Sequence, residues 1–208
     1  MHRVLLALLL APHAFAAGFA DIQTFDAAHS WTSGNPNPNP PTLLPDSGPL
    51  GPGDTALRVS ASGGGGAGSK LVIFSTSDWT GNYLAAGISS IRMDLRNAAI
   101  TPLSIRIALN GPGGWFITPG QTVAPFQPWD RFVYELGAES LLSAGGIDAT
   151  ATLANVGEIR IFHGTSDAAF QGQSISGQML VDNIQAVPEA TGTLFLGLGC
   201  LTCLRRKR

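Results

Sequence analysis

The chain has 208 residues with 12 basic and 14 acidic side chains, 26 Gly, 14 Pro and 2 Cys. Charged residues make up 12% of the chain, about half the usual share, and no basic cluster occurs before the last four residues, so the sequence excludes nucleic acid as a partner. Because 44% of the residues are hydrophobic, the chain has enough apolar side chains to form a folded core.

The N-terminal residues have the layout of a secretory signal peptide. Residues 1–3 form a short positive start, residues 4–11 are all apolar, and residues 14–16 read Ala-Phe-Ala. The apolar run is far shorter than the roughly 20 residues that a membrane-spanning helix needs. We therefore expect a signal peptide over 1–16 that signal peptidase removes after Ala16, with a second small-residue site at 18–20. The alternative is a buried first helix.

In the body of the chain, apolar and polar side chains alternate with a period of two. Residues 91–96, 103–108 and 159–161 show this alternation, which is typical of half-buried strands. Further strands are expected at 19–25, 56–62, 70–75, 115–118, 131–136 and 179–186. Glycine-rich turns separate them, and a helical turn is hinted at only over 138–144. The pattern predicts an all-β jelly-roll β-sandwich over residues 17–186.

One segment, residues 33–53, departs from this pattern because it holds seven prolines in 21 residues. Such a proline density disfavours sheet pairing and favours extended backbone, so we expect a long surface loop after the first strand. The loop could act as a ligand lid or a partner-binding segment. The alternative is a tolerated insertion without a function.

The C-terminal residues 187–208 contain three parts: Val187, Pro188 and Glu189, then an apolar segment over 191–204, then four cations over 205–208. Fourteen residues in a helix cover about 21 Å, less than the roughly 30 Å of a hydrocarbon core. The cations hold the tail in the cytoplasm and leave the body on the far side of the membrane. A span this short suits a transient sorting signal better than a permanent anchor.

This three-part order resembles the PEP-CTERM sorting domain. The resemblance implies recognition by an exosortase in the inner membrane of a Gram-negative bacterium that makes extracellular polysaccharide. Residues 191–204 would then insert transiently as a transmembrane helix, and the processed protein would reach the cell surface or the extracellular medium. The chain carries Ala190 where the family has its second proline. The alternative is a plain C-terminal anchor.

Removal of both ends leaves a body without cysteine that carries seven basic and thirteen acidic side chains, a net charge of −6. An acidic exported body favours neutral glycans or cations as partners over polyanions.

The body resembles the galactose-binding-like jelly rolls of carbohydrate-binding modules. The similar residues are Phe25-Asp26, 78–83, 113–116, Phe162-His163 and 181–184. The resemblance implies a structural Ca²⁺ site at Asp26 and Asp182, completed by loop carbonyls, because a jelly roll brings its first and last strands together and calcium takes several oxygen ligands. The alternative is that Asp26 ends a strand and Asp182 caps the final turn.

Two aromatic residues, Trp79 and Tyr83, flank Gly81-Asn82 in an expected loop. Sugar rings stack on exposed aromatic faces, so this pair is the candidate ligand-binding site, and packing in the core is the alternative. No catalytic motif occurs, and a pair such as Glu135 and Glu139 reads as solvated surface charge.

The sequence therefore predicts an exported, exosortase-processed, non-catalytic protein that binds polysaccharide or contributes to an exopolysaccharide matrix. A purely structural surface protein is the alternative, followed by a secreted glycan-active enzyme.

Overall fold

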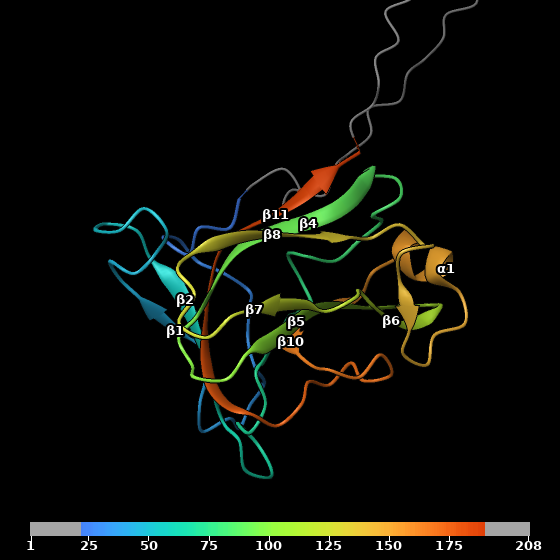
Figure 1. Cartoon of the computed structure of the whole chain (residues 1–208). Helices are drawn as coiled ribbons and strands as arrows, with labels where there is room; N and C mark the ends of the chain where they lie inside the picture. Colours follow the sequence, from blue (N-terminus) through green and yellow to red (C-terminus); the bar gives the residue numbers. More distant parts are fainter. Residues whose placement is uncertain (1–21, 190–208) are drawn as a thin grey trace, which may run out of the picture.

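Two β-sheets packed face to face make up residues 22–189, the part of the chain that the computed structural model describes (Figure 1). The predicted all-β sandwich is confirmed. The expected signal peptide over 1–16 and the expected apolar segment over 191–204 lie outside the described residues. Within 22–189, no helix has the length and apolar composition that crossing a membrane requires.

The first sheet has five strands in the order β1-β2-β11-β4-β8. The second has the order β3-β10-β5-β6-β9, with β7 paired to β5. Paired strands run antiparallel throughout both sheets. The elements are β1 (Thr42–Leu44), β2 (Ala56–Ser62), β3 (Val72–Ser75), β4 (Ile88–Asn97), β5 (Leu103–Gly111), β6 (Gly114–Ile117), β7 (Gln121–Val123), β8 (Asp130–Glu135), β9 (Leu142–Ser143), the helix α1 (Ala149–Ala154), β10 (Glu158–His163) and β11 (Ser176–Pro188).

The inward side chains of the two sheets form the main core. In β4, the side chains of Ile91, Met93 and Leu95 are fully buried. Arg92 and Arg96, at alternate positions of the same strand, face outward. Full burial of an apolar side chain of this size stabilises the fold by about 1.5–3 kcal/mol, so the alternation fixes which face of β4 is inner. The facing layer from the second sheet comprises Ile105, Ile107, Leu109, Ile159 and Ile161.

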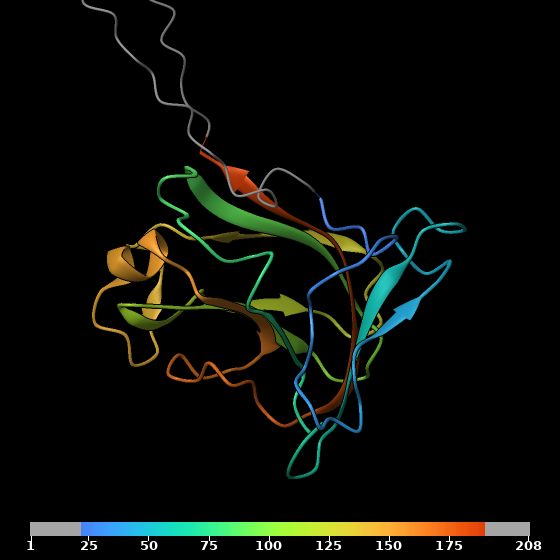
Figure 2. The same cartoon turned by 180° about the vertical axis from the view of Figure 1, so that it is seen from behind.

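The first described residues link the two sheets instead of forming the strand expected at 19–25. Gln23 makes an isolated bridge with Ile184 of β11, and Thr32 makes another with Phe74 of β3. Figure 2 shows this segment, in blue, running across the molecule beside β11. Between the bridges Phe25 is buried in the core with a φ of 59°, and this left-handed backbone ends any extended run.

The proline-rich segment does contribute a strand, contrary to the expectation. The three residues of β1, which lie between Pro41 and Pro45, pair with β2 at the edge of the five-stranded sheet. An edge strand pairs on one side only, so flanking prolines without an N–H group are tolerated there. The residues that follow, 45–53, form the expected loop.

The helical turn expected at 138–144 is limited to a single hydrogen-bonded turn over 138–140, in which the Ser140 N–H donates to the Gly137 carbonyl oxygen at 2.8 Å, and residues 142–143 form β9. The helix lies further on, at α1, where the side chain of Asp148 caps the N-terminus by accepting a hydrogen bond from the Ala151 N–H at 2.9 Å. With only six residues, α1 is too short to show helical periodicity in the sequence.

The three residues proposed as a sorting motif belong to the end of the sandwich. Val187 and Pro188 are the last residues of β11 and lie opposite Ser90 and Ile88 of β4. The Glu189 N–H donates to the Gly87 carbonyl oxygen at 2.7 Å. The last strand therefore continues two residues past the predicted end of the domain at 186.

The aromatic pair expected on a loop rim lies in the core. Trp79 is 3% exposed and Tyr83 is fully buried. The Tyr83 hydroxyl donates to the Trp79 carbonyl oxygen at 2.8 Å, and the Trp79 ring lies 5.6 Å from the ring of Trp31. A sugar stacks only on an exposed ring, so the expectation of exposed, ligand-binding side chains at these two positions is wrong, and core packing is their role.

Replacing Trp79 by Ala should lower the free energy of unfolding by about 3–5 kcal/mol, because the change removes a large buried ring and leaves a cavity. Urea denaturation followed by circular dichroism measures the loss. Phe126→Ala is the matched control: this ring is 68% exposed, so its removal should change stability by less than about 0.5 kcal/mol. An unchanged midpoint for Trp79→Ala would return Trp79 to the list of ligand-binding candidates.

Candidate functional site

The two aspartates proposed as calcium ligands lie close enough to influence each other. Asp182 of β11 is fully buried, and Asp26 accepts a hydrogen bond from the Thr55 N–H at 3.0 Å. Oδ1 of Asp182 accepts from the Asn183 N–H at 2.7 Å, but Oδ2 has no hydrogen-bond partner among the described residues. An orphaned carboxylate oxygen in the protein interior is costly, so this atom requires a proton or a cation.

The surroundings of Asp182 favour its protonated form. Burial raises its pKa to about 7, and the negative charges of Asp54, Asp26 and Asp94 add to the effect, while the hydrogen bond from Asn183 opposes it. Within residues 22–189, no three His, Cys, Asp or Glu side chains are grouped as a metal site. A cation here would therefore need backbone oxygens to complete its shell.

A hollow of about 270 Å³, lined by five polar and three apolar residues, lies on the outer face of the five-stranded sheet, and we call it the outer-face hollow. Strands β4, β8 and β11 form its floor, and the loop over 45–53 together with Ile22 forms its wall. The lining residues are Ile22, Pro49, Leu50, Arg92, Asp94, Arg131, Asn183 and Gln185.

The loop over 45–53 is held in place across this face of the sheet. The indole N–H of Trp129, just before β8, donates to the carbonyl oxygen of Ser47, just after β1, at 3.1 Å. Because β1 and β8 are the opposite edges of the sheet, the loop must reach over the strands between them. Asp54 fixes the shape of the loop, since its backbone oxygen accepts from Ser47 and Gly48 and its Oδ2 accepts from Leu50. The proline-rich segment thus covers part of a hollow, as a lid would.

A hydrogen-bonded network fixes the polar floor of the hollow. Arg131 donates through Nε and Nη2 to the two carboxylate oxygens of Asp94, at 2.8 and 3.0 Å. Asn183 Nδ2 donates to Asp94 Oδ2 at 2.8 Å. These hydrogen bonds, and after them the charge of Asp94, raise the pKa of Arg131. Such bidentate pairs are geometrically specific, so the network holds its members in one arrangement.

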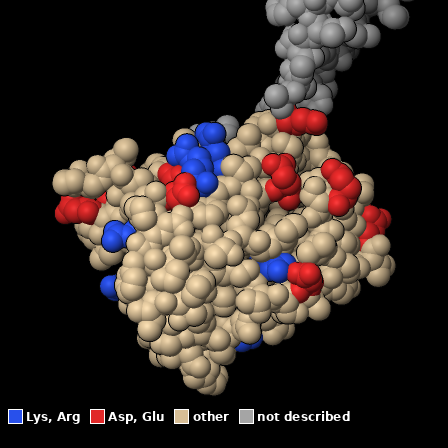
Figure 3. All heavy atoms as spheres, in the orientation of Figure 1, with Lys and Arg blue, Asp and Glu red and all other residues tan. Residues whose placement is uncertain are grey.

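A register shift in β11 places Asn183 in this network. The pairing of β11 with β4 is interrupted between Asp182 and Gln185, and Asn183 has a φ of 51°. A bulge of this kind redirects side chains locally, and here it brings an amide to Asp94. Figure 3 shows a group of basic side chains over the layer of β4 and β8 with acidic ones beside it, and further acidic side chains spread over the rest of this face.

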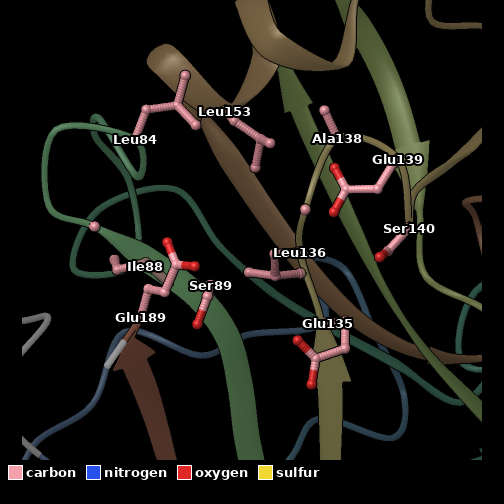
Figure 4. A pocket seen from close by; sticks show the side chains of 12 residues that line it. Leu84, Ile88, Ser89, Glu135, Leu136, Ala138, Glu139, Ser140, Leu153 and Glu189 are labelled. Carbon is pink, nitrogen blue, oxygen red and sulfur yellow. The ribbon is translucent and has the colours of Figure 1, made fainter. Parts of the chain in front are cut away.

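A second hollow, of about 460 Å³, opens at the end of the sandwich where β11 finishes (Figure 4). Three glutamates from different segments border it: Glu135 in β8, Glu139 in the loop that follows, and Glu189 after β11. Figure 4 shows their carboxylates on different sides of the hollow. Glu135 and Glu139 are both exposed, as expected of solvated surface charge.

The histidine at the end of β10 has a structural environment. His163 is buried, and its Nδ1 accepts a hydrogen bond from the backbone N–H of Ser104 at 3.0 Å. Burial lowers the pKa of His163, so the ring is neutral at physiological pH. Its Nδ1 lone pair is engaged by the backbone and is not available to a nucleophile.

Sequence reasoning did not single out the residues of the outer-face hollow. Arg92 and Asp94 were recognised as outward positions of a strand, which is correct, but nothing local in the sequence tells which outward positions lie under a loop. One sequence signal for the hollow was the proline-rich segment over 33–53. Its interpretation as a ligand lid predicts that the segment covers a site, but it does not predict which face of which sheet is covered.

No family model and no curated protein sequence matches the chain. Among solved structures, the family 11 carbohydrate-binding module of the cellulosomal cellulase Lic26A-Cel5E of Clostridium thermocellum is 16% identical, with a TM-score of 0.50 over 83% of this chain and 98% of the module. A solution structure of CtCBM11 gives a TM-score of 0.54 over 85% of this chain and 98% of that one, also at 16% identity.

An exo-β-agarase is 10% identical with a TM-score of 0.51, and the match covers 72% of this chain but only 23% of the agarase. The chain thus spans about a quarter of the agarase and nearly the whole of the binding modules. At these identities the likeness concerns the fold: this chain has the β-sandwich found in carbohydrate-binding modules.

Proposed function

We propose that the protein is an exported, non-catalytic polysaccharide-binding protein and that the glycan occupies the outer-face hollow. The observation that carries the proposal is the outer-face hollow itself, a site with hydrogen-bonded polar groups and apolar walls on a β-sandwich that matches binding modules over 98% of their length. Contribution to an exopolysaccharide matrix would follow from such binding.

The chemistry of the hollow suits a sugar. Sugar hydroxyls both donate and accept hydrogen bonds, and the floor offers a carboxylate at Asp94, an amide at Asn183 and a guanidinium at Arg131 in fixed positions. The wall adds apolar surface, since Leu50 is 86% exposed. A few convergent polar groups beside apolar contact surface are the usual composition of a ligand site.

A purely structural role and a glycan-active enzyme remain the alternatives. An enzyme would use the second hollow, where the glutamates are. Glycoside hydrolysis needs two carboxyl groups facing each other across the scissile bond, one of them protonated in an apolar environment. The exposed positions of Glu135 and Glu139 speak for the non-catalytic proposal.

Arg131→Ala should weaken retention on the cognate polysaccharide by about tenfold or more, because it removes a guanidinium that forms part of the floor and frees Asp94. Affinity electrophoresis of the exported protein through gels containing a panel of polysaccharides provides the measurement. Glu139→Ala, in the second hollow, should leave retention unchanged. Loss of retention in Glu139→Ala, with normal retention of Arg131→Ala, would place the glycan in the second hollow. Absence of retention of the unchanged protein on any polysaccharide would favour the structural alternative.

Export and processing form a second part of the proposal. Signal peptidase would release the N-terminus, and an exosortase would recognise Val187, Pro188 and Glu189 with the segment that follows. The protein would be anchored transiently by 191–204 before it reaches the cell surface or the medium. The support for this part is that the three motif residues lie at the very end of the closing strand and directly after it.

Intact-mass measurement of the extracellular protein should give a species that begins at residue 17 and lacks residues 205–208. The control is the same protein from a host without exosortase, which should keep the basic tail. An extracellular species that retains 205–208 in the native host would contradict processing, and a membrane-bound species of full C-terminal length would indicate a permanent anchor.

We further propose that Ca²⁺ binds beside Asp182, with Asp26 and backbone carbonyls as the other ligands. The support is the buried, unpartnered Oδ2 of Asp182 near other carboxylates, since hard cations take several oxygen ligands. The ion would neutralise a cluster of negative charge and join the first described residues to the last strand.

The Asp182 carboxyl makes stability depend on pH in the absence of a cation. Because its pKa rises from 3.8 to about 7 on folding, its contribution is most favourable below pH 4 and is lost as the pH rises from about 4 to 7, by as much as about 4 kcal/mol. Thermal unfolding in a chelator should show this fall, and Ca²⁺ at pH 7 should reverse it. Asp182→Asn should abolish both effects, whereas Glu139→Gln should keep them. Equal melting temperatures with Ca²⁺ and with chelator at pH 7 would rule out the site.

A further inference from the structure

We infer that the outer-face hollow selects a polysaccharide that carries carboxylates, and that Arg92 binds the carboxylate of a uronic acid residue. The inference rests on the proposed function, because it names the class of glycan for the same site. It is independent of the calcium proposal.

Arg92 is the unpaired charge of the hollow. In the sheet register it lies between Gln185 of β11 and Val133 of β8, neither of which is charged. Among the described residues it makes no hydrogen bond or ion pair. Two positions along the strand, Asp94 is neutralised by Arg131. The hollow therefore holds one compensated ion pair and one uncompensated guanidinium.

The neighbour of Arg92 lacks a partner as well. Oε1 of Gln185 is buried and receives no hydrogen bond from any described residue. Arg92 itself is half-buried, so its charge is partly withdrawn from water. An anion for the guanidinium and a hydroxyl donor for the amide oxygen are the groups that a sugar acid presents side by side.

The lining also argues against a site built for neutral sugars. None of its eight residues is aromatic, and the ring stacking that orients neutral sugars is therefore missing there.

The net negative charge of the body, which favours neutral partners, acts at long range. At physiological salt the Debye length is about 8 Å, so carboxylates further from Arg92 than that are largely screened. The nearby guanidinium decides the preference.

A carboxylate can pair with this guanidinium through both of its oxygens, because the planar fork of arginine makes bidentate contacts with carboxylates. A sulfate ester carries the same charge on a tetrahedral group that can also present two oxygens to the fork, so a sulfated polymer tests whether charge alone is sufficient.

The experiment compares four soluble polymers in affinity electrophoresis with the full exported protein: polygalacturonate, its fully methyl-esterified form, dextran sulfate and a neutral mixed-linkage β-glucan. We expect retention on polygalacturonate, and esterification or Arg92→Gln should weaken it roughly 10- to 100-fold, the range for a charge-assisted hydrogen-bonded contact. Arg96→Gln is the matched control, because Arg96 is an exposed outward arginine of the same strand that does not line the hollow. It should change retention by less than about twofold.

The outcomes separate the two proposals. Equal retention on the esterified polymer or the neutral glucan, with Arg92→Gln indifferent, would overturn the uronate inference and leave polysaccharide binding standing. Retention on dextran sulfate that depends on Arg92 and equals that on polygalacturonate would overturn the selection of carboxylate. Absence of retention on all four polymers, together with a negative glycan panel, would overturn both.

Discussion

The pairing of β11 between β2 and β4 is the constraint on which the rest of the structure depends. This strand of 13 residues supplies inward side chains to the core and outward side chains to the candidate site. The register shift in β11 determines which of its side chains point inward and which point outward. Ile184 stays in the core, while Asn183 contacts Asp94 on the outer face. A bulge costs backbone pairing energy, so its presence beside the hollow is itself a sign of a shaped site.

The hollow exists because a loop is tied to the far edge of the sheet and is held in shape by its own hydrogen bonds. The sheet alone offers a row of outward polar side chains, which water would cover. The contact between Trp129 and Ser47 and the internal hydrogen bonds around Asp54 hold the loop at a fixed height above them. Binding to a preformed hollow avoids the entropic cost of ordering a loop, which matters for a site that has few polar contacts and no stacking ring.

Much of the fold follows from local sequence, and much less of the site does. The strands expected from the alternation at 91–96, 103–108 and 159–161 lie inside β4, β5 and β10, which extend up to three residues further at their ends, because burial of every second side chain determines the inner face. The strand expected at 131–136 matches β8 to within one residue. The strand β1 was not predicted because prolines lie on both sides of its three residues. Prolines are tolerated there because β1 is an edge strand and pairs on one side only. Trp79 was misplaced because its flanking glycine and asparagine are typical of an exposed loop, whereas its ring fills the core. Arg92 and Asp94 line a hollow because the Trp129–Ser47 hydrogen bond holds the loop over the sheet. The two residues of this contact are 82 positions apart in the sequence, so no local pattern predicts it.

The end of β11 has a mechanical consequence. Pro188 is still in register with β4 and the Glu189 amide is bound to Gly87, so the sheet grips the chain up to its last described residue. A proteolytic cut within β11 would require the strand to separate from β4, which would break hydrogen bonds between the strands and expose the buried side chain of Ala186. The sandwich thus protects its own closing strand from proteolysis.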